Sequence, residues 1–224
     1  MREAEESQKS ADPENLELRP GLRQSIPVTA TGPGPTPADA ELVARARAGD
    51  REAFAAIYHR HHAGIYRFAR AMTGSTAMAE DVTQEVFVAL IGEFERYDPS
   101  RAGLGTYLYA IARNMCRYKL RRERRFVALE IATAKLPSTT DDPSRAMMQT
   151  QAAAKVRIFI TGLSLRYREV LILCDLQELS YEQASVVLNV PVGTVRSRLH
   201  RARRLLADRL TKDPIFQAPR AERR

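Results

Sequence analysis

The sequence is poor in cysteine and in long hydrophobic runs, and each shortage excludes a class of protein. Only Cys116 and Cys174 occur in 224 residues, far apart and without a CxxC spacing. This argues against a disulfide framework or a cysteine-built zinc site and favours a reducing compartment. The longest apolar runs, such as residues 170–174, are far too short to cross a bilayer, and the first residues lack the apolar stretch of a signal peptide. We therefore expect a soluble, cytoplasmic protein without membrane insertion.

Acidic residues are also in deficit. The chain has 35 Lys plus Arg against 27 Asp plus Glu, a formal net charge of +8. This balance favours a polyanionic partner, either nucleic acid or acidic lipid, and carries no information about fold. Hydrophobic residues make up 44% of the chain, enough for a packed interior in one large domain or two small ones. No Walker loop, GxSxG or HExxH motif occurs, so we expect neither an enzyme nor a bound cofactor.

Proline and the loss of helical periodicity divide the chain into segments. The N-terminal segment holds six of the twelve prolines with few large apolar residues between them, so we expect it to be disordered. A second aperiodic, polar stretch contains Pro137 and Pro143 and is expected to be a flexible linker. No strand-like alternation is found, which predicts an all-α fold. The expected organisation is a tail (1–38), a small helical domain (39–125), the linker (126–149), a second small helical domain (150–212) and a short tail (213–224).

Capping residues and apolar spacing predict the individual helices. Asp39 and Asp50 are expected N-caps of the first two helices, and Thr73 with Gly74 is expected to end the second. Apolar residues at helical spacing predict the others. These later helices are expected over about 76–94, 104–124, 149–161, 165–176, 181–188 and 192–210.

Residues 180–210 predict a DNA-reading element. Ser180 is suited to cap a short helix, and Asn189-Val190-Pro191 is suited to a tight turn before a longer helix, which together make a helix-turn-helix. From residue 193 to 212 there are seven Lys or Arg and one acid. At 100° per residue one side of the longer helix carries Val195, Leu199, Ala202 and Leu206, and the other carries Arg196, Ser197, His200, Arg201 and Arg204.

A cationic outer face of this kind suits docking in the DNA major groove, with its first residues aimed at base edges. We expect Arg203, Arg204 and Arg209, further along, to meet phosphates. The alternative is an amphipathic surface helix whose arginines are merely solvated. The preceding turn and short helix favour DNA reading over that alternative.

Two segments of the first domain have opposite charge. Residues 76–95 contain five acids and no Lys or Arg, whereas residues 113–125 contain seven Lys or Arg and one acid. The acidic helix suits a basic partner surface, although an ordinary solvated face is the alternative. A metal site at Glu80, Asp81 and Glu85 is disfavoured because adjacent helical residues diverge and no His lies in step with them. His59, His61 and His62 lack a suitable further ligand and are expected to be surface residues.

The basic helix predicts a nucleic-acid ridge. By angle, Arg113, Asn114, Arg117 and Arg121 lie opposite an apolar stripe of Leu108, Ile111 and Met115. Such a ridge is able to follow a phosphate backbone. The preceding loop, residues 98–105, carries two glycines and is suited to wrap an extruded base.

Sequence strings in both predicted helical domains resemble those of one protein family, the extracytoplasmic-function (ECF) sigma factors of bacterial RNA polymerase. The second-domain strings are similar to the family's upstream-element-binding domain: Tyr167-Arg168-Glu169-Val170-Leu171, Leu179-Ser180-Tyr181-Glu182 and residues 190–203. In the first domain, residues 79–87 resemble its polymerase-docking helix, and residues 97–99 and 108–114 resemble its promoter-melting segment. The family usually has Trp at Tyr107, Ala at Ser185 and Gly at Asn189.

The resemblance implies roles for the site residues. Polymerase docking is expected at Glu80, Asp81, Gln84 and Glu85, against the clamp helices of the largest polymerase subunit. The loop is expected to capture a flipped base of the downstream promoter element, and base unstacking costs a few kcal/mol, so capture also drives opening. Melting and downstream recognition are expected at Asp98, Arg101, Gly103, Arg113, Asn114, Arg117 and Arg121. The resemblance also implies core RNA polymerase, promoter DNA and an anti-sigma factor as partners.

Two other functions compete with that of a sigma factor. A stand-alone helix-turn-helix regulator would bind duplex DNA without polymerase, and it needs neither the acidic helix nor the basic melting helix. A serine recombinase with a C-terminal helix-turn-helix would need a strand-rich catalytic domain with a reactive serine, and the sequence indicates neither. We therefore favour the sigma factor.

Overall fold

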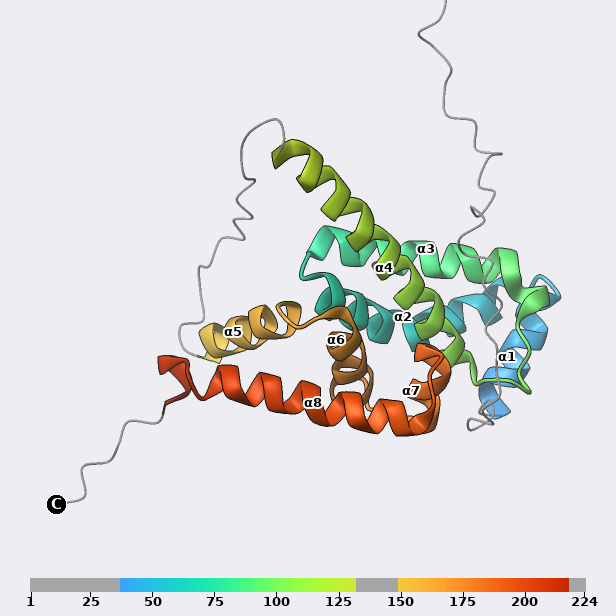
Figure 1. Ribbon diagram of the computed structural model, residues 1–224. Helices are drawn as coiled ribbons and strands as arrows, with labels where there is room; N and C mark the ends of the chain where they lie inside the picture. The colour runs from blue at the N-terminus through green and yellow to red at the C-terminus, as the bar shows by residue number, and fades with distance from the viewer. Residues whose placement is uncertain (1–36, 132–148, 218–224) are drawn as a thin grey trace, which may run out of the picture.

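The computed structural model describes residues 37–131 and 149–217, and within these ranges it contains helices and no strands. The all-α prediction is confirmed, while the expected N-terminal tail up to residue 36 and residues 132–148 of the expected linker lie outside the described ranges. None of the described helices is both long and apolar enough to cross a membrane. The elements are α1 (Pro37–Arg47), α2 (Arg51–Thr73), α3 (Thr76–Glu93), η2 (Phe94–Arg96), α4 (Leu104–Ile131), α5 (Gln149–Thr161), α6 (Leu165–Leu171), η3 (Ile172–Leu176), α7 (Tyr181–Leu188), α8 (Val192–Leu210) and η4 (Pro214–Phe216) (Figure 1).

Local capping chemistry sets most helix ends where the sequence predicts them. The Asp50 carboxylate accepts hydrogen bonds from the first amides of α2, and Gly74 ends that helix in the left-handed conformation at φ 78°. Ser180 caps α7 in a capping box, in which its hydroxyl accepts from the Gln183 amide and the Gln183 side chain accepts from the Ser180 amide. These three predicted boundaries are confirmed.

Two predicted boundaries need correction. Asp39 is not an N-cap, because α1 begins at Pro37, whose fixed φ suits a first helical position. Asp39 instead lies buried in the first turn of α1 and pairs with Arg60 of α2. Helix α4 continues to Ile131 rather than ending near Arg124, because residues 128–130 are good helix formers and no Gly or Pro interrupts them. The start of the expected linker is therefore helical.

The predicted helix over 165–176 changes its geometry halfway. Helix α6 gives way to the π-helical turn η3, in which each backbone hydrogen bond spans one more residue than in an α-helix. The turn buries Ile172 and Leu173 and leaves Leu176 46% exposed. It thereby directs two apolar side chains into the interior at the point where the second set of helices meets the first.

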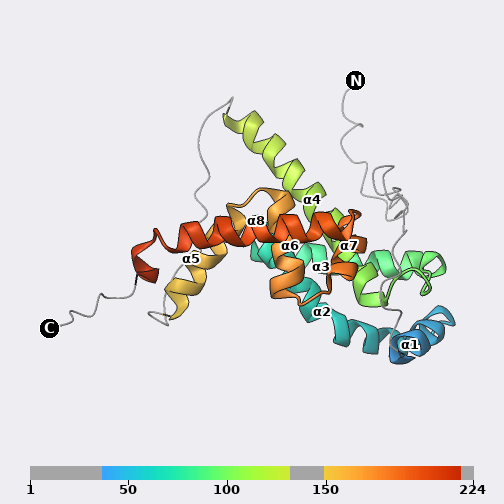
Figure 2. The same ribbon diagram turned by 60° about the horizontal axis from the view of Figure 1, so that its bottom comes forward.

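The two expected sets of helices are both present and pack against each other. We call α1–α4 the first helical unit and α5–α8 the second helical unit. Figures 1 and 2 show the second unit lying along α2 and α4, and the contacts of α7 with α4 and of η3 with α2 join the two units. The buried apolar residues of both units form one continuous cluster.

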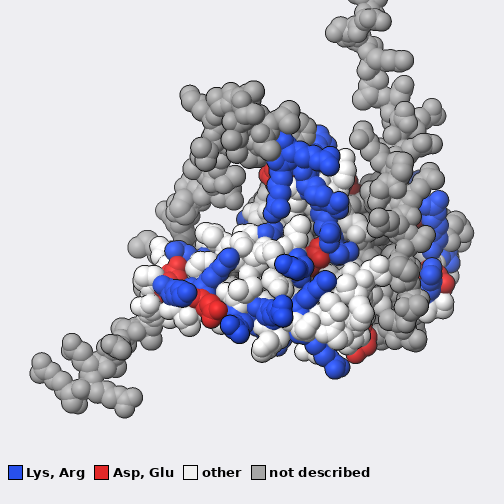
Figure 3. Space-filling view, in the orientation of Figure 1, with Lys and Arg blue, Asp and Glu red and all other residues white. Residues whose placement is uncertain are grey.

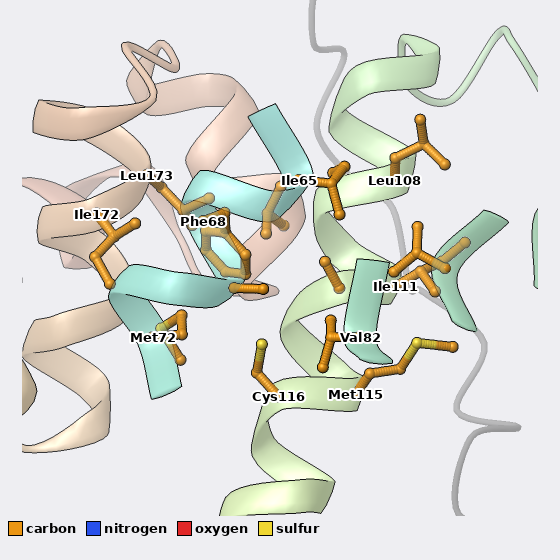
Figure 4. Close-up of a cluster of buried hydrophobic side chains, with 14 of the residues drawn as sticks. Ile65, Phe68, Met72, Val82, Leu108, Ile111, Met115, Cys116, Ile172 and Leu173 are labelled. Atoms are coloured by element: carbon orange, nitrogen blue, oxygen red, sulfur yellow. The ribbon is translucent and has the colours of Figure 1, made fainter. Parts of the chain in front are cut away.

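Helix α2 supplies the centre of that shared core. Phe68 and Met72 are fully buried, with Ile172 and Leu173 of η3 on one side and α4 on the other (Figure 4). Cys116 of α4 is also fully buried there, and burial raises the pKa of its thiol to about 12. Cys174 is half-buried and, like Cys116, a free thiol, as a core role predicts.

The turn between α7 and α8 gives a stability prediction. Asn189 is exposed and adopts the left-handed conformation at φ 52°, a conformation that costs a β-branched residue roughly 1–2 kcal/mol. Asn189→Val should therefore lower the free energy of unfolding by about 1–2 kcal/mol, while Asn189→Gly should leave it unchanged or raise it. Urea unfolding followed by circular dichroism measures both, and equal stability of the two variants would show that the turn does not need this conformation.

Candidate nucleic-acid interface

The helix-turn-helix is built by α7, the Asn189 turn and α8. The turn is closed by hydrogen bonds from the amides of Asn189 and Val190 to carbonyls of α7, the second of them 3.1 Å long. Val195, Leu199 and Ala202 of α8 are buried, with at most 2% of each exposed. The opposite face is exposed as the angular prediction requires, at Arg196, Ser197, His200, Arg201 and Arg204.

Side chains around α8 hold part of this face in place. The Arg196 guanidinium lies over the Tyr181 ring, 5.7 Å from its centroid, a cation–π contact that positions it beside the start of the helix. Arg203 makes two hydrogen bonds to the Asp175 carboxylate, at 3.0 and 2.6 Å. Arg209 donates to the carbonyl of Phe159 in α5, at 2.9 Å. Arg203 and Arg209, which the sequence assigned to phosphates, therefore also bind within the second helical unit.

The acidic face of α3 is presented to solvent. Val82, Val86 and Leu90 are fully buried on the inner side of the helix, and Glu80, Asp81, Gln84 and Glu85 are exposed on the outer side. Lys119 of α4 lies beside this face, 2.8 Å from a Glu85 oxygen and 3.5 Å from an Asp81 oxygen. Part of the acidic charge is thus already neutralised within the first helical unit.

Sequence reasoning missed two residues of the same face. Val88 and Ile91 continue the exposed side of α3 one and two turns beyond Gln84 and are 52% and 58% exposed. Helical spacing places both away from the stripe of Val82, Val86 and Leu90, and this spacing is the signal that could have found them. Exposed neighbouring aliphatic side chains mark an interaction surface more strongly than isolated ones.

The loop before α4 is held by its own polar residues. The Asp98 carboxylate accepts hydrogen bonds from the Ser100 hydroxyl at 2.7 Å and the Ser100 amide at 2.9 Å, and these bonds lower the pKa of Asp98. Arg47 of α1 donates to the carbonyls of Phe94 and Tyr97. Among the predicted loop residues, Asp98 and Arg101 are exposed and Gly103 is half-buried.

Two tyrosines anchor the ends of that loop. Tyr97 is buried and its hydroxyl donates to the carbonyl of Ala102, at 3.1 Å, and burial raises its pKa to about 12. The ring of Tyr107 lies 5.2 Å from that of Tyr97, and its hydroxyl donates to Glu93 at 3.1 Å. The loop is therefore a fixed ledge between the end of α3 and the start of α4.

The basic ridge of α4 is only partly exposed. Figure 3 shows Lys and Arg gathered over the far end of α4 and along α8, on one face of the molecule. Arg121 is exposed, but Asn114 and Arg117 are half-buried, and the Arg113 side chain is only 14% exposed. The second helical unit covers this part of the ridge through Glu169 of α6, whose side chain is 1% exposed.

Two adjacent charged residues of α6 are buried between the units, and sequence reasoning gave neither a role. Glu169 accepts from Arg117 at 3.1 Å and lies 3.2 Å from Arg113. Arg168 donates to the carbonyl of Met72 in α2 at 2.6 Å and to that of Leu163 at 3.1 Å. Burial lowers the pKa of Arg113 and of Arg168, and the neighbouring Glu169 opposes that effect in both.

The histidines of α2 contact protein groups. His61 lies 3.6 Å from the Asp39 carboxylate, and burial lowers its pKa while Asp39 raises it. His62 stacks on Tyr58 with ring centroids 5.0 Å apart, and His59 is exposed. Within residues 37–131 and 149–217, no group of three His, Cys, Asp or Glu side chains is arranged to hold a metal ion.

The two halves of the chain match two family models. Residues 57–126 match sigma-70 region 2, and residues 159–206 match sigma-70 region 4. The ECF RNA polymerase sigma factor SigW of Bacillus subtilis is 30% identical over 75% of this chain and 94% of its own length. SigE of Mycolicibacterium smegmatis, also an ECF RNA polymerase sigma factor, is 33% identical over 68% of this chain, and the match spans 60% of that longer protein.

Solved structures share the fold. CnrH, solved in complex with the cytosolic domain of CnrY, superposes with a TM-score of 0.60 at 27% identity, over 79% of this chain and 99% of CnrH. The sigma factor RpoE of Bartonella quintana, solved with the anti-sigma factor NepR, has a TM-score of 0.58 at 24% identity over 71% of this chain and 98% of its own, a likeness of fold. With both family regions present in order, the chain belongs to the sigma-70 family of RNA polymerase sigma factors, in its ECF group.

Proposed function

We propose that this sigma factor acts through three separate surfaces: the outer face of α3 docks on core RNA polymerase, the ledge and ridge of α4 hold melted promoter DNA, and α8 reads the upstream promoter element. As a sigma factor it is a transcription initiation factor and not an enzyme. The segregation of charge supports this division, because an exposed acidic face on α3 coexists with basic faces on α4 and α8 in a chain of net charge +8. Run-off transcription with core polymerase on genomic fragments tests the whole assignment, and its failure to yield promoter-specific transcripts would refute it.

The outer face of α3 suits a basic protein partner. Its acids supply charge complementarity, and Val88 and Ile91 supply apolar area beside them, the combination that gives an interface both steering and affinity. Core RNA polymerase is the partner that the family assigns to this helix. We also propose a cytoplasmic location, which the proposed polymerase and promoter DNA partners support.

A protein regulator is part of the proposal. CnrH, which shares 27% of its sequence with this chain, was solved bound to another protein, the cytosolic domain of CnrY. We propose that an anti-sigma factor likewise binds this chain and competes with polymerase for the outer face of α3.

Docking is tested by reversing the charge of Glu80. Asp81 and Glu85 are avoided because Lys119 contacts both of them. Glu80→Lys should weaken binding to core polymerase by about tenfold or more, because a like charge would then face the basic partner. Competition with a labelled reference sigma factor measures this affinity. Glu41→Lys on the exposed side of α1 makes the same change of charge and should bind normally. If the two variants bind alike, α3 is not the docking helix.

Melting is tested by removing the covered arginines of α4. The double substitution Arg113→Ala and Arg117→Ala should leave closed promoter complexes of the holoenzyme intact and reduce strand opening, because the phosphates of the single strand lose their partners. Permanganate footprinting of unpaired thymines measures the opening. Arg125→Ala, two turns beyond Arg117 on the same helix, is the control with normal opening. A full bubble in the double variant would contradict the assignment.

Sequence reading by α8 is tested by comparing two classes of arginine. Arg196→Ala or Arg201→Ala should cost about 1–3 kcal/mol of holoenzyme binding on the preferred upstream element and little on a scrambled one, because a bidentate contact to guanine is lost. Arg204→Ala should weaken both sequences equally and lower the salt slope by about one. Affinities across a salt series measure both effects. Equal losses on both elements for Arg196 and Arg201 would make α8 an electrostatic anchor only.

A further inference from the structure

The contact between Glu169 and α4 has a specific chemistry. The carboxylate is 1% exposed; Arg117 donates to both of its oxygens, at 3.1 and 3.4 Å, and Arg113 lies 3.2 Å from Oε2. Arg198 of α8 is a further cation near Arg113. Guanidinium groups recognise carboxylates and phosphates through the same N–H geometry. Glu169 therefore presents to Arg113 and Arg117 the same kind of anionic oxygens that a backbone phosphate has.

Several other contacts hold the second helical unit in this place. Helix α7 packs along α4, and the Tyr109 hydroxyl of α4 donates to Gln177 at 3.0 Å. Arg168 reaches across to the Met72 carbonyl at the end of α2. Together with the shared core around Phe68, these contacts make the covering of α4 a built interface and not a single ion pair.

In the same packed arrangement the outer face of α8 remains exposed to solvent. Arg196, Arg201 and Arg204 are exposed in the packed structure, so the face assigned to duplex DNA does not take part in the interface. The arginines assigned to the single strand, by contrast, are paired with Glu169. One of the two DNA-binding surfaces is thus closed and the other is available.

We propose that in the free chain the second helical unit closes the single-strand site of α4, with the Glu169 carboxylate in place of nucleic-acid phosphate, while duplex reading by α8 stays open. Single-stranded DNA and the second helical unit then compete for Arg113 and Arg117. Binding of either weakens the other, because both use the same two guanidiniums. This inference rests on the proposed role of α4 in holding melted DNA.

The test uses the full chain and a neutral, isosteric substitution. Glu169→Gln removes the charge that pairs with Arg113 and Arg117, and the two guanidiniums, left partly buried without a counter-charge, then favour separation of the units. Asp208→Asn, an exposed acid of α8, is the matched control for loss of one negative charge. Fluorophores on bio-orthogonal side chains at exposed Glu123 of α4 and Lys212 beyond α8 report the separation of the units by energy transfer.

Binding is measured with labelled oligodeoxythymidine as the single strand and with a duplex of equal length. Glu169→Gln should lower energy transfer and tighten single-strand binding by about tenfold, because more of the chain is then competent to bind. Its duplex affinity should change by less than about twofold, and Asp208→Asn should behave as the unsubstituted chain in every measurement. In the unsubstituted chain, saturating oligodeoxythymidine should itself lower energy transfer, a readout that needs no variant.

Each other outcome overturns the proposal. Unchanged energy transfer in both Glu169→Gln and the oligonucleotide-saturated chain would show that Glu169 does not hold the units together. Lower transfer without tighter single-strand binding would show that the units part but that Glu169 does not compete with phosphate. The proposed melting role is judged separately by permanganate footprints of the holoenzyme, so a normal bubble in the Arg113 and Arg117 double variant would identify that role as the failure.

Discussion

A buried carboxylate needs cations or hydrogen-bond donors to replace the hydration that it loses, and this constraint governs one central contact between the two helical units of the sigma factor. Glu169 satisfies it with Arg113 and Arg117, which both belong to the other unit. Arg168, the preceding residue, is a buried cation. Its guanidinium donates to carbonyl oxygens instead, one of them that of Met72 at the end of α2. Polar contacts alone therefore join helix α6 to two elements of the first helical unit, α4 and α2.

The apolar core adds buried hydrophobic surface between these two polar contacts. Phe68 and Met72 pack between η3 and α4, and such contacts favour burial without fixing a direction. The contacts of Glu169 with Arg113 and Arg117 add a directional component to that packing. Removing one partner of a buried pair leaves an uncompensated charge and costs more than exchanging apolar groups of similar size, so the ion pairs and the shared core hold the units together jointly.

The elements that sequence reasoning predicted well are those whose partners are close in the chain. The exposed face of α8 follows from helical periodicity, because Val195 and Leu199 pack on α6 and α7 of the same unit. The capping box and the Asn189 turn are equally local. The prediction for α4 was right in angle, since Arg113 and Arg117 do point away from the Leu108 stripe, but periodicity does not distinguish a side facing solvent from a side facing a second unit.

Glu169 was missed for the same reason. In the sequence it is an acid in an amphipathic helix, and such acids are usually solvated. Its burial depends on Arg117, 52 residues earlier in the chain, which no local pattern reveals. Val88 and Ile91 are a different case, because helical spacing alone places these apolar residues off the buried stripe of α3, and the structure shows them exposed.

The π-helical turn η3 makes the packing of the two helical units sensitive to insertion or deletion of a residue. The sequence alone does not reveal this sensitivity. Each residue of a regular helix turns the rest of the chain by about 100°, so the extra residue accommodated in Ile172–Leu176 sets the azimuth of everything downstream relative to α2. A deletion of one residue there would change the angle at which the chain leaves the helix toward α7. The spatial relation between α8 and α4 in the packed chain thus depends on the number of residues in this one turn.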